Sequence, residues 1–282
     1  MTNTIIQGNN VDVVKTIPND SIDLILTSPP YDDIRTYKSN TKIKDEFDGY
    51  SFDFNNLVPE LVRVLKPGGV IVWVVGDGVM NGGETGNSFR QALKFISSGV
   101  ILHDTMIYKK NTSSFPANRK GKRYTQIFEY MFVFSKGQPA YASLICDKEN
   151  RWAGHTNWGK KTHRGKSNEL VVTKDIKPVP KFSPRNNIWE YVVGGGFATK
   201  DKEAHKHPAI FPEKLATDHI LTWTPRGGIV LDPFVGSGTT TKMAAINDRN
   251  FIGIDISKEY VKIAQNRTYR EIKIPNPFFE KS

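Results

Sequence analysis

The run Leu26–Tyr31 (LTSPPY) combines groups that suit chemistry on an amine. Two consecutive prolines, Pro29 and Pro30, restrict the backbone and remove two N–H donors, which leaves the nearby carbonyl oxygens free of local pairing. The Ser28 hydroxyl and a proline carbonyl could then accept hydrogen bonds from both protons of one –NH₂ group, and Tyr31 offers a flat face on which a base could stack. The alternative interpretation is that the prolines only end a strand and that Tyr31 covers the core.

A second candidate site lies far downstream, where Ile229–Thr240 (IVLDPFVGSGTT) has the pattern of a strand, a glycine turn and the start of a helix. Gly236 and Gly238 permit a sharp bend and a close backbone approach to a ligand. The next apolar run ends at Asp255, where a carboxylate is placed to accept both hydroxyls of a ribose. Together these segments predict a site for an adenosine-containing cofactor. Thr241 stands where a dinucleotide fingerprint has its third glycine, and the spacing alone leaves a dinucleotide, another adenosine ligand or a purely structural turn open.

Apolar periodicity predicts the elements that would position these residues. Strands are expected at 22–26, 70–75, 100–108, 127–134, 228–231 and 251–255. Helices are expected at 54–64, around 89–96, from Pro212 to about Trp223 and at 239–246, with Ser257 as the cap of a final helix. Strands that alternate with helices predict an α/β fold with a doubly wound, mostly parallel sheet, in which ligands bind at the carboxyl ends of the strands. Both candidate sites follow such strands.

The chain is expected to divide into three parts. Residues 1–136 and 207–282 show the α/β alternation and are expected to form two halves of one domain. Residues 137–206 are polar and basic, contain three tryptophans and show no sustained period, which predicts an irregular insertion.

The net charge of +10 is concentrated in two stretches, 109–123 and 136–206, which predicts a polyanionic partner such as nucleic acid. The loop 32–50, which includes Arg35, Tyr37, Lys38 and Lys42, is expected either to close over a bound base or to be a solvated charged loop. The residues expected to contact nucleic acid are Arg35, Lys109, Lys110, Arg119, Lys120, Lys122 and Arg123.

Other functional classes find little support. Cys146 is the single cysteine, so an internal disulfide is impossible, and the spacing of the histidines does not suit zinc; we therefore expect no metal site. The sequence contains no apolar run long enough for a membrane span and no signal peptide, so a cytoplasmic, nucleoid-associated protein of prokaryotic or phage origin is expected.

The motif Thr27–Tyr31 followed downstream by Asp232–Thr240 resembles the β class of amino-directed DNA methyltransferases, in which the catalytic tetrad precedes the cofactor motif. Gln7–Asn9, Leu65–Gly69 and His207–Leu215 are similar to further segments of that family. The resemblance implies a Rossmann-like methyltransferase sheet, S-adenosylmethionine as the cofactor and double-stranded DNA as the partner. A cognate restriction endonuclease is a further expected partner if the enzyme is not solitary. The insertion at 137–206 falls where this class has its target-recognition region.

The resemblance also implies roles for individual residues. Ser28, Pro29, Pro30 and Tyr31 would form the catalytic tetrad, which acts on the exocyclic amine of a flipped base. Asn9 stands where the family more often has Asp. The residues expected around the cofactor are Asn9, Phe211, Lys214, Asp232, Phe234, Gly236, Ser237, Gly238, Thr239 and Asp255.

Cytosine N4 is the expected acceptor, because Ser28 occupies the position where adenine-directed tetrads usually have Asp or Asn. An adenine-N6 methyltransferase is the alternative. Methylation of RNA or of a protein amide is a further alternative, closer to the expected function than the hypotheses from other functional classes. Two hypotheses from other classes are a catalytically silent DNA-binding subunit and a nicotinamide-dependent oxidoreductase, although the second leaves Ser28–Tyr31 unexplained.

Overall fold

The computed structural model describes residues 2–30, 53–80, 82–111, 122–156, 162–172, 177–193, 198–206, 210 and 212–271. The chain forms two compact units, one made of Met1–Ser143 with Asn187–Ser282 and the other of Leu144–Asn186. The segment expected to be one insertion, 137–206, is thus divided between them. None of the described helices is both long and apolar enough to cross a membrane.

The first unit is built on an eight-stranded sheet with the strand order β1-β14-β13-β2-β3-β7-β6-β12. The strands from β1 to β3 in this order are parallel, β7 is antiparallel to both of its neighbours, and β12 is parallel to β6. The predicted doubly wound, mostly parallel sheet is therefore confirmed. The strands are β1 (Thr4–Gln7), β2 (Ile22–Thr27), β3 (Leu65–Val75), β6 (Ile101–Lys110), β7 (Phe128–Ser135), β12 (Ile188–Tyr191), β13 (Ile229–Asp232) and β14 (Asn250–Asp255).

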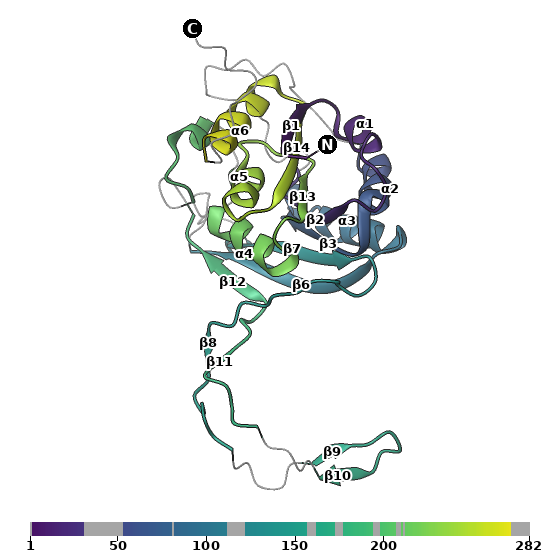
Figure 1. Cartoon of the computed structure of the whole chain (residues 1–282), viewed down its shortest axis with the longest axis vertical. Helices are drawn as coiled ribbons and strands as arrows, with labels where there is room; N and C mark the ends of the chain where they lie inside the picture. Colours follow the sequence, from purple (N-terminus) through teal and green to yellow (C-terminus); the bar gives the residue numbers. More distant parts are fainter. Residues whose placement is uncertain are drawn as a thin grey trace. The chain divides into compact units, whose positions relative to one another are not determined.

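Helices cover both faces of this sheet, with α1, α2 and α3 on one face and α4, α5 and α6 on the other (Figure 1). Their bounds are α1 (Asn10–Lys15), α2 (Phe54–Val64), α3 (Asn87–Ser97), α4 (Glu213–Trp223), α5 (Thr239–Ile246) and α6 (Lys258–Glu271). The short helix η1 (Lys202–Lys206) and the strands β4 (Val79–Met80) and β5 (Gly83–Glu84) complete the regular structure of the described part of this unit.

Local signals account for most helix ends. Ser257 accepts a hydrogen bond from the Tyr260 N–H at 3.4 Å, as expected of a residue that caps α6. Pro212 was expected inside the first turn of α4, but it has extended backbone angles and precedes the helix as its N-cap. Proline suits this place because it has no N–H to leave unpaired.

The junction between α2 and β3 differs from the sequence prediction. The helix ends at Val64 as expected, but the strand, expected at 70–75, already begins at Leu65 and so includes Pro67, Gly68 and Gly69. The residue that precedes a proline disfavours helical angles, so Lys66 already has to be extended. Gly68 has a φ of +75°, and its N–H donates to the Lys136 carbonyl at 2.6 Å. The glycine turn therefore lies within the sheet.

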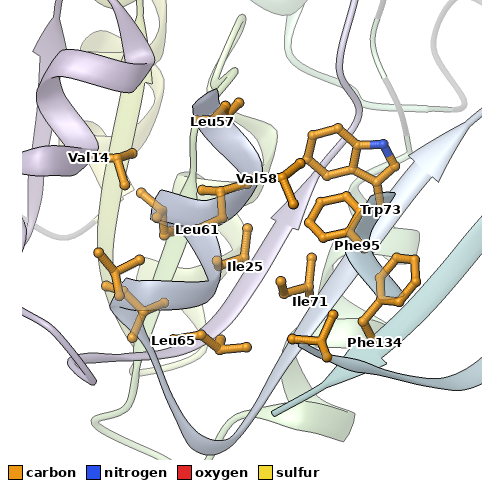
Figure 2. Packing of buried hydrophobic residues seen from close by; sticks show 14 of the residues in the cluster. Val14, Ile25, Leu57, Val58, Leu61, Leu65, Ile71, Trp73, Phe95 and Phe134 are labelled. Atoms are coloured by element: carbon orange, nitrogen blue, oxygen red, sulfur yellow. The ribbon is translucent and has the colours of Figure 1, made fainter. Parts of the chain in front are cut away.

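The core beneath the first half of the sheet is aliphatic and aromatic. The predicted apolar face of α2 is confirmed, because Leu57, Val58, Leu61 and Val64 are all fully buried. In Figure 2, Val58 of α2 lies beside Trp73 and Phe95, with Leu57 and Leu61 on the same helix. The Trp73 ring lies 6.2 Å from that of Phe234, centroid to centroid. This contact connects the turn after β13 to the core.

The second unit, Leu144–Asn186, has two short antiparallel strand pairs where the sequence predicted irregular structure. β8 (Lys148–Glu149) pairs with β11 (Phe182–Ser183), and β9 (Thr162–Arg164) pairs with β10 (Leu170–Val172). None of the described residues of this unit is buried.

Candidate active site

The two sequence motifs meet at the carboxyl edge of the sheet because β2 and β13 are parallel neighbours. Leu24 pairs with Val230 and Ile25 with Leu231. Both strands then end within two residues of this register, so Ser28 and the turn after Asp232 start at the same edge. In a doubly wound sheet this edge is where ligands bind.

A buried hydrogen bond joins the ends of these two strands. The Thr27 hydroxyl donates to Asp232 Oδ1 at 2.6 Å, and the Phe234 N–H donates to the same oxygen at 3.0 Å. Thr27 is fully buried and Asp232 is 1% exposed. Burial raises the pKa of Asp232 to about 6, although the hydrogen bonds from Thr27, Thr240 and the Phe234 N–H oppose this rise.

The described part of the tetrad follows β2 directly. Ser28 and Pro30 are partly exposed, whereas Pro29 is buried. Ser28 is therefore not fully enclosed by the protein at this edge of the sheet. Tyr31 lies outside the described residues.

The glycine loop, Asp232–Gly238, turns sharply before α5. Gly236 and Gly238 have φ values of +48° and +83°, a backbone region that residues other than glycine rarely adopt. A Cβ on Gly238 would also lie 2.7 Å from the Ala264 Cα, so α6 packs against the loop with no space for a side chain. Both glycines are thus required by the backbone, as the motif predicted.

Asp255 holds the loop from the end of β14. Its Oδ2 accepts the Gly236 N–H at 3.0 Å, and its Oδ1 accepts the Ser257 N–H at 2.9 Å. Burial raises the pKa of Asp255 to about 6, with a further upward contribution from the charge of Asp232, while these backbone hydrogen bonds lower it. A carboxylate offers about four acceptor positions, and the backbone N–H groups of Gly236, Ser257 and Ile256 use three of them, which leaves one for a ligand hydroxyl. The site therefore fits a ribose hydroxyl.

A polar group at the start of α5 has no partner among the described residues. The Thr239 hydroxyl is buried, and within the described residues it has no hydrogen-bond partner. It lies at the positive end of the helix dipole, where anionic groups are favoured. This position suits a polar or negatively charged part of a cofactor.

Three other residues were expected to contact the cofactor: Asn9, Lys214 and Phe211. Asn9 lies next to Asp255, because Gln7 pairs with that residue in the sheet, but its side chain accepts the Val11 N–H at 2.9 Å as the cap of α1. Because Asn caps a helix as well as Asp does, Asn9 can take the place of the Asp that the family more often has at this position. Lys214 is exposed and pairs with Asp218 at 3.1 Å. Phe211 lies outside the described residues.

Ser237, which was expected to contact the cofactor, is buried, and its carbonyl accepts a hydrogen bond from the Arg267 guanidinium. Arg267 is fully buried and also pairs with Asp201 at 3.1 Å and with Glu213 at 3.0 Å. Lys242 pairs with Glu213 at 3.0 Å. This ionic cluster supports the glycine loop from the side of α6.

Sequence reasoning missed Thr27 and Arg267. Nothing in the pattern of one strand reveals that the Thr27 hydroxyl will contact a carboxylate 205 residues away. Arg267 did leave a signal, since it lies on the same helical face as Ala264, and a charged residue on an apolar face is unusual unless it is paired.

The expected nucleic-acid contacts lie partly in ion pairs. Lys109 pairs with Glu190 at 2.8 Å, Lys110 with Glu129 at 2.5 Å and Arg123 with Glu84 at 2.6 Å. The Lys110–Glu129 pair is largely buried, so the charge of Lys110 is compensated within the protein. Lys122 is exposed. Arg35, Arg119 and Lys120 lie outside the described residues.

Across the described ranges no group of three or more His, Cys, Asp or Glu side chains is placed to hold a metal ion.

Comparisons with known proteins agree with this geometry. The chain matches the DNA methylase family N6_N4_Mtase over residues 22–266. It is 52% identical over 247 residues to the orphan methyltransferase M.BamHII of Bacillus amyloliquefaciens, with 88% of each chain covered. The structure of the PvuII DNA methyltransferase, described as cytosine-N4-specific, has a TM-score of 0.63 at 21% identity and covers 95% of this chain and 86% of its own. A DNA modification methylase of Thermus thermophilus, solved with S-adenosyl-L-methionine, has a TM-score of 0.58 at 21% identity over 98% of this chain and 96% of its own.

Proposed function

Since the chain belongs to the DNA methylase family N6_N4_Mtase, we propose that it methylates the exocyclic N4 amine of cytosine in double-stranded DNA, with S-adenosylmethionine as the methyl donor. The observation that carries this proposal is the juxtaposition of two motifs at one sheet edge. Ser28 and Pro29 follow β2, and the glycine loop follows the neighbouring β13.

The glycine loop and its neighbours would hold the cofactor. Asp255 would accept a hydrogen bond from a ribose hydroxyl, and Gly236 and Gly238 would let the backbone approach. The Thr239 hydroxyl would supply a polar contact at the helix start. Phe234 and Ser237 belong to the same loop, and Asn9, Phe211 and Lys214 stay predicted neighbours. S-adenosylmethionine supplies an electrophilic methyl group.

The tetrad would act on the amine. An exocyclic amine is a weak nucleophile because its lone pair is conjugated with the ring. If the Ser28 Oγ and the Pro29 carbonyl accept its two protons, the nitrogen is favoured in the tetrahedral geometry that it needs during the transfer. The partial exposure of Ser28 supports this role, since the hydroxyl must meet a group from outside the protein. Positioning of the amine in line with the methyl group supplies most of the remaining rate enhancement.

The amine is inaccessible inside a duplex, so the base has to be flipped out, and Tyr31 would stack against it. The unit Leu144–Asn186 suits DNA recognition because it has ten Lys and Arg residues against four Asp and Glu, and none of its described residues is buried. We assign the choice of target sequence to the segment 137–206, which contains this unit. M.BamHII is named an orphan methyltransferase, so a cognate restriction endonuclease is not a required part of the proposal.

Cytosine is preferred to adenine for two reasons. Ser28 stands where adenine-directed tetrads usually have Asp or Asn, and the structural neighbour from the PvuII system is cytosine-N4-specific. Both amines have two N–H donors, so the chemistry of the tetrad itself does not separate them.

The test is to incubate the purified enzyme with unmodified DNA and S-adenosylmethionine, digest the DNA to nucleosides and identify the product by mass spectrometry. We expect N4-methylcytosine. N6-methyladenine alone would overturn the base assignment, whereas an absence of methylated nucleosides together with retained DNA binding would favour a silent DNA-binding subunit.

Ser28→Ala is the matched variant for this experiment. We expect the rate of transfer to fall on the order of a hundredfold or more, because one preorganised polar group of the site is removed. A calorimetric titration with S-adenosylmethionine should give an unchanged affinity. A parallel loss of cofactor affinity would mean that Ser28 only supports the end of β2.

A further inference from the structure

The catalytic strand and the cofactor strand separate at the point where their functional residues begin. The backbone pairing between β2 and β13 includes Leu24–Val230 and Ile25–Leu231 and extends no further in the described register. On its other side β2 stays paired with β3 as far as Thr27, which lies opposite Trp73. The last two residues of β2 are therefore aligned with β3 but have no backbone register with β13.

Side chains make the connection that the backbone lacks. The Thr27 hydroxyl donates to Asp232 Oδ1 at 2.6 Å, and the Thr240 hydroxyl oxygen lies 3.4 Å from the Leu26 carbonyl oxygen. Thr27 and Thr240 are fully buried and Asp232 nearly so. The contact between Thr27 and Asp232 is short and shielded from water, and it joins the residue before Ser28 to the first residue of the glycine loop.

The carboxylate of Asp232 is used inside the protein. The same Oδ1 that accepts the Thr27 hydroxyl also accepts the Phe234 N–H at 3.0 Å, which sets the first bend of the glycine loop. With 1% of its surface exposed, Asp232 is placed to fix the loop rather than to contact a ligand. One oxygen thus connects the residue before Ser28 with the loop expected to hold the cofactor.

We propose that Thr27 and Asp232 are positioning residues, whose hydrogen bond sets the distance between the amine-accepting groups after β2 and the glycine loop after β13. This inference rests on the proposed methyl transfer and reassigns Asp232, which was expected to contact the cofactor. The bond determines how well the amine and the methyl group are aligned, so it controls the rate of transfer and leaves the affinity for each substrate nearly unchanged. Misplacement of reacting groups by about 1 Å costs on the order of a hundredfold in rate.

The test compares Thr27→Val with Thr27→Ser in the full-length protein. Valine has nearly the shape of threonine but no hydroxyl, whereas serine keeps the hydroxyl and loses a methyl group. We expect Thr27→Val to lower kcat for DNA methylation by about tenfold to a hundredfold. The KM for DNA and the calorimetric Kd for S-adenosylmethionine should change by less than about threefold, and Thr27→Ser should recover most of the wild-type kcat.

A control variant separates this effect from general loss of a buried hydroxyl. Thr268 is also fully buried, and its hydroxyl lies 2.9 Å from that of Thr241, between α6 and α5. Thr268→Val should lower the thermal unfolding midpoint about as much as Thr27→Val and should retain the wild-type kcat.

Three results would overturn the inference. Thr27→Val could retain the wild-type kcat, it could lose cofactor affinity by the same factor as kcat, or Thr27→Ser could be as slow as Thr27→Val. The methylation rate of the wild-type enzyme, measured in the same assay, separates these three results from failure of the proposed function. A wild type that methylates no base contradicts both proposals, whereas equal rates of wild type and Thr27→Val contradict the positioning role alone.

Discussion

The glycine loop and the unit Leu144–Asn186 use polar side chains in opposite ways. The loop is held by buried groups that are distant in sequence, among them Thr27, Asp255 and Arg267. In Leu144–Asn186 no described residue is buried, and pairs such as Arg185 with Asp147 lie at the surface. Isolated two-stranded pairs without a core are only marginally stable. The protein therefore concentrates its buried polar contacts on holding the site of chemistry and keeps most charges of the second unit available to a partner.

The largest expected effect tests the buried side of this contrast. Arg267→Met should lower the free energy of unfolding by about 3 kcal/mol, because it removes the fully buried partner of Asp201 and Glu213, although Lys242 still pairs with Glu213. Arg270 also pairs with Asp201, at 2.7 Å, but its side chain is 55% exposed. Arg270→Met should therefore cost less than about 1 kcal/mol. Urea unfolding of both variants measures the difference, and equal losses would contradict the assigned role of Arg267.

A smaller effect is expected for the ligand-facing group of the same region. Asp255→Asn should weaken S-adenosylmethionine binding by about 1.5–3 kcal/mol, the usual value of a hydrogen bond to a charged group. Burial raises the pKa of Asp255 to about 6, and the ionised form is the better acceptor for ribose hydroxyls. Cofactor affinity of the wild type should thus fall as the pH is lowered through about 6, and the affinity of Asp255→Asn should not.

The same raised pKa has the opposite consequence for stability. The folded protein favours protonated Asp255, so the contribution of this group to stability is complete below a pH of about 4 and is lost as the pH rises through about 6. The unfolding free energy of the wild type relative to Asp255→Asn should decline over this range and then level off. Calorimetric titrations and unfolding at several pH values measure both trends. An exposed carboxylate on α1 gives the control Asp12→Asn, which should alter neither.

The smallest effects on folding are expected in the second unit. Lys166 and Lys177 are exposed, and neutralising both with glutamine should change the free energy of unfolding by less than about 0.5 kcal/mol. If both contact phosphates, the slope of log affinity for DNA against log salt should become shallower by about 2. Lys110→Gln is the contrasting variant, because Glu129 already compensates its charge, and we expect it to leave the slope unchanged. A normal slope for the double variant would show that DNA contacts lie elsewhere.

Some features of this protein are local enough to be read from the sequence. The helix after the glycine loop was expected at 239–246 and is α5, Thr239–Ile246, because the glycine turn, which ends at Gly238 in left-handed conformation, determines where it begins. The buried face of α2 followed from spacing in the same way. These signals depend on residues within one or two turns of each other, and so they need no knowledge of neighbouring elements.

The tertiary structure alone decided which polar groups meet. The sequence indicated that Asp232 belongs to a cofactor motif, but the adjacency of β2 and β13 turned its carboxylate towards Thr27. It also predicted a free Lys110, which a neighbouring strand pairs with Glu129, and an insertion whose residues Ile188–Tyr191 instead extend the sheet as β12. Backbone conformation is set largely by nearby residues, whereas the partner of a buried charge or hydroxyl is set by whichever strand or helix packs beside it.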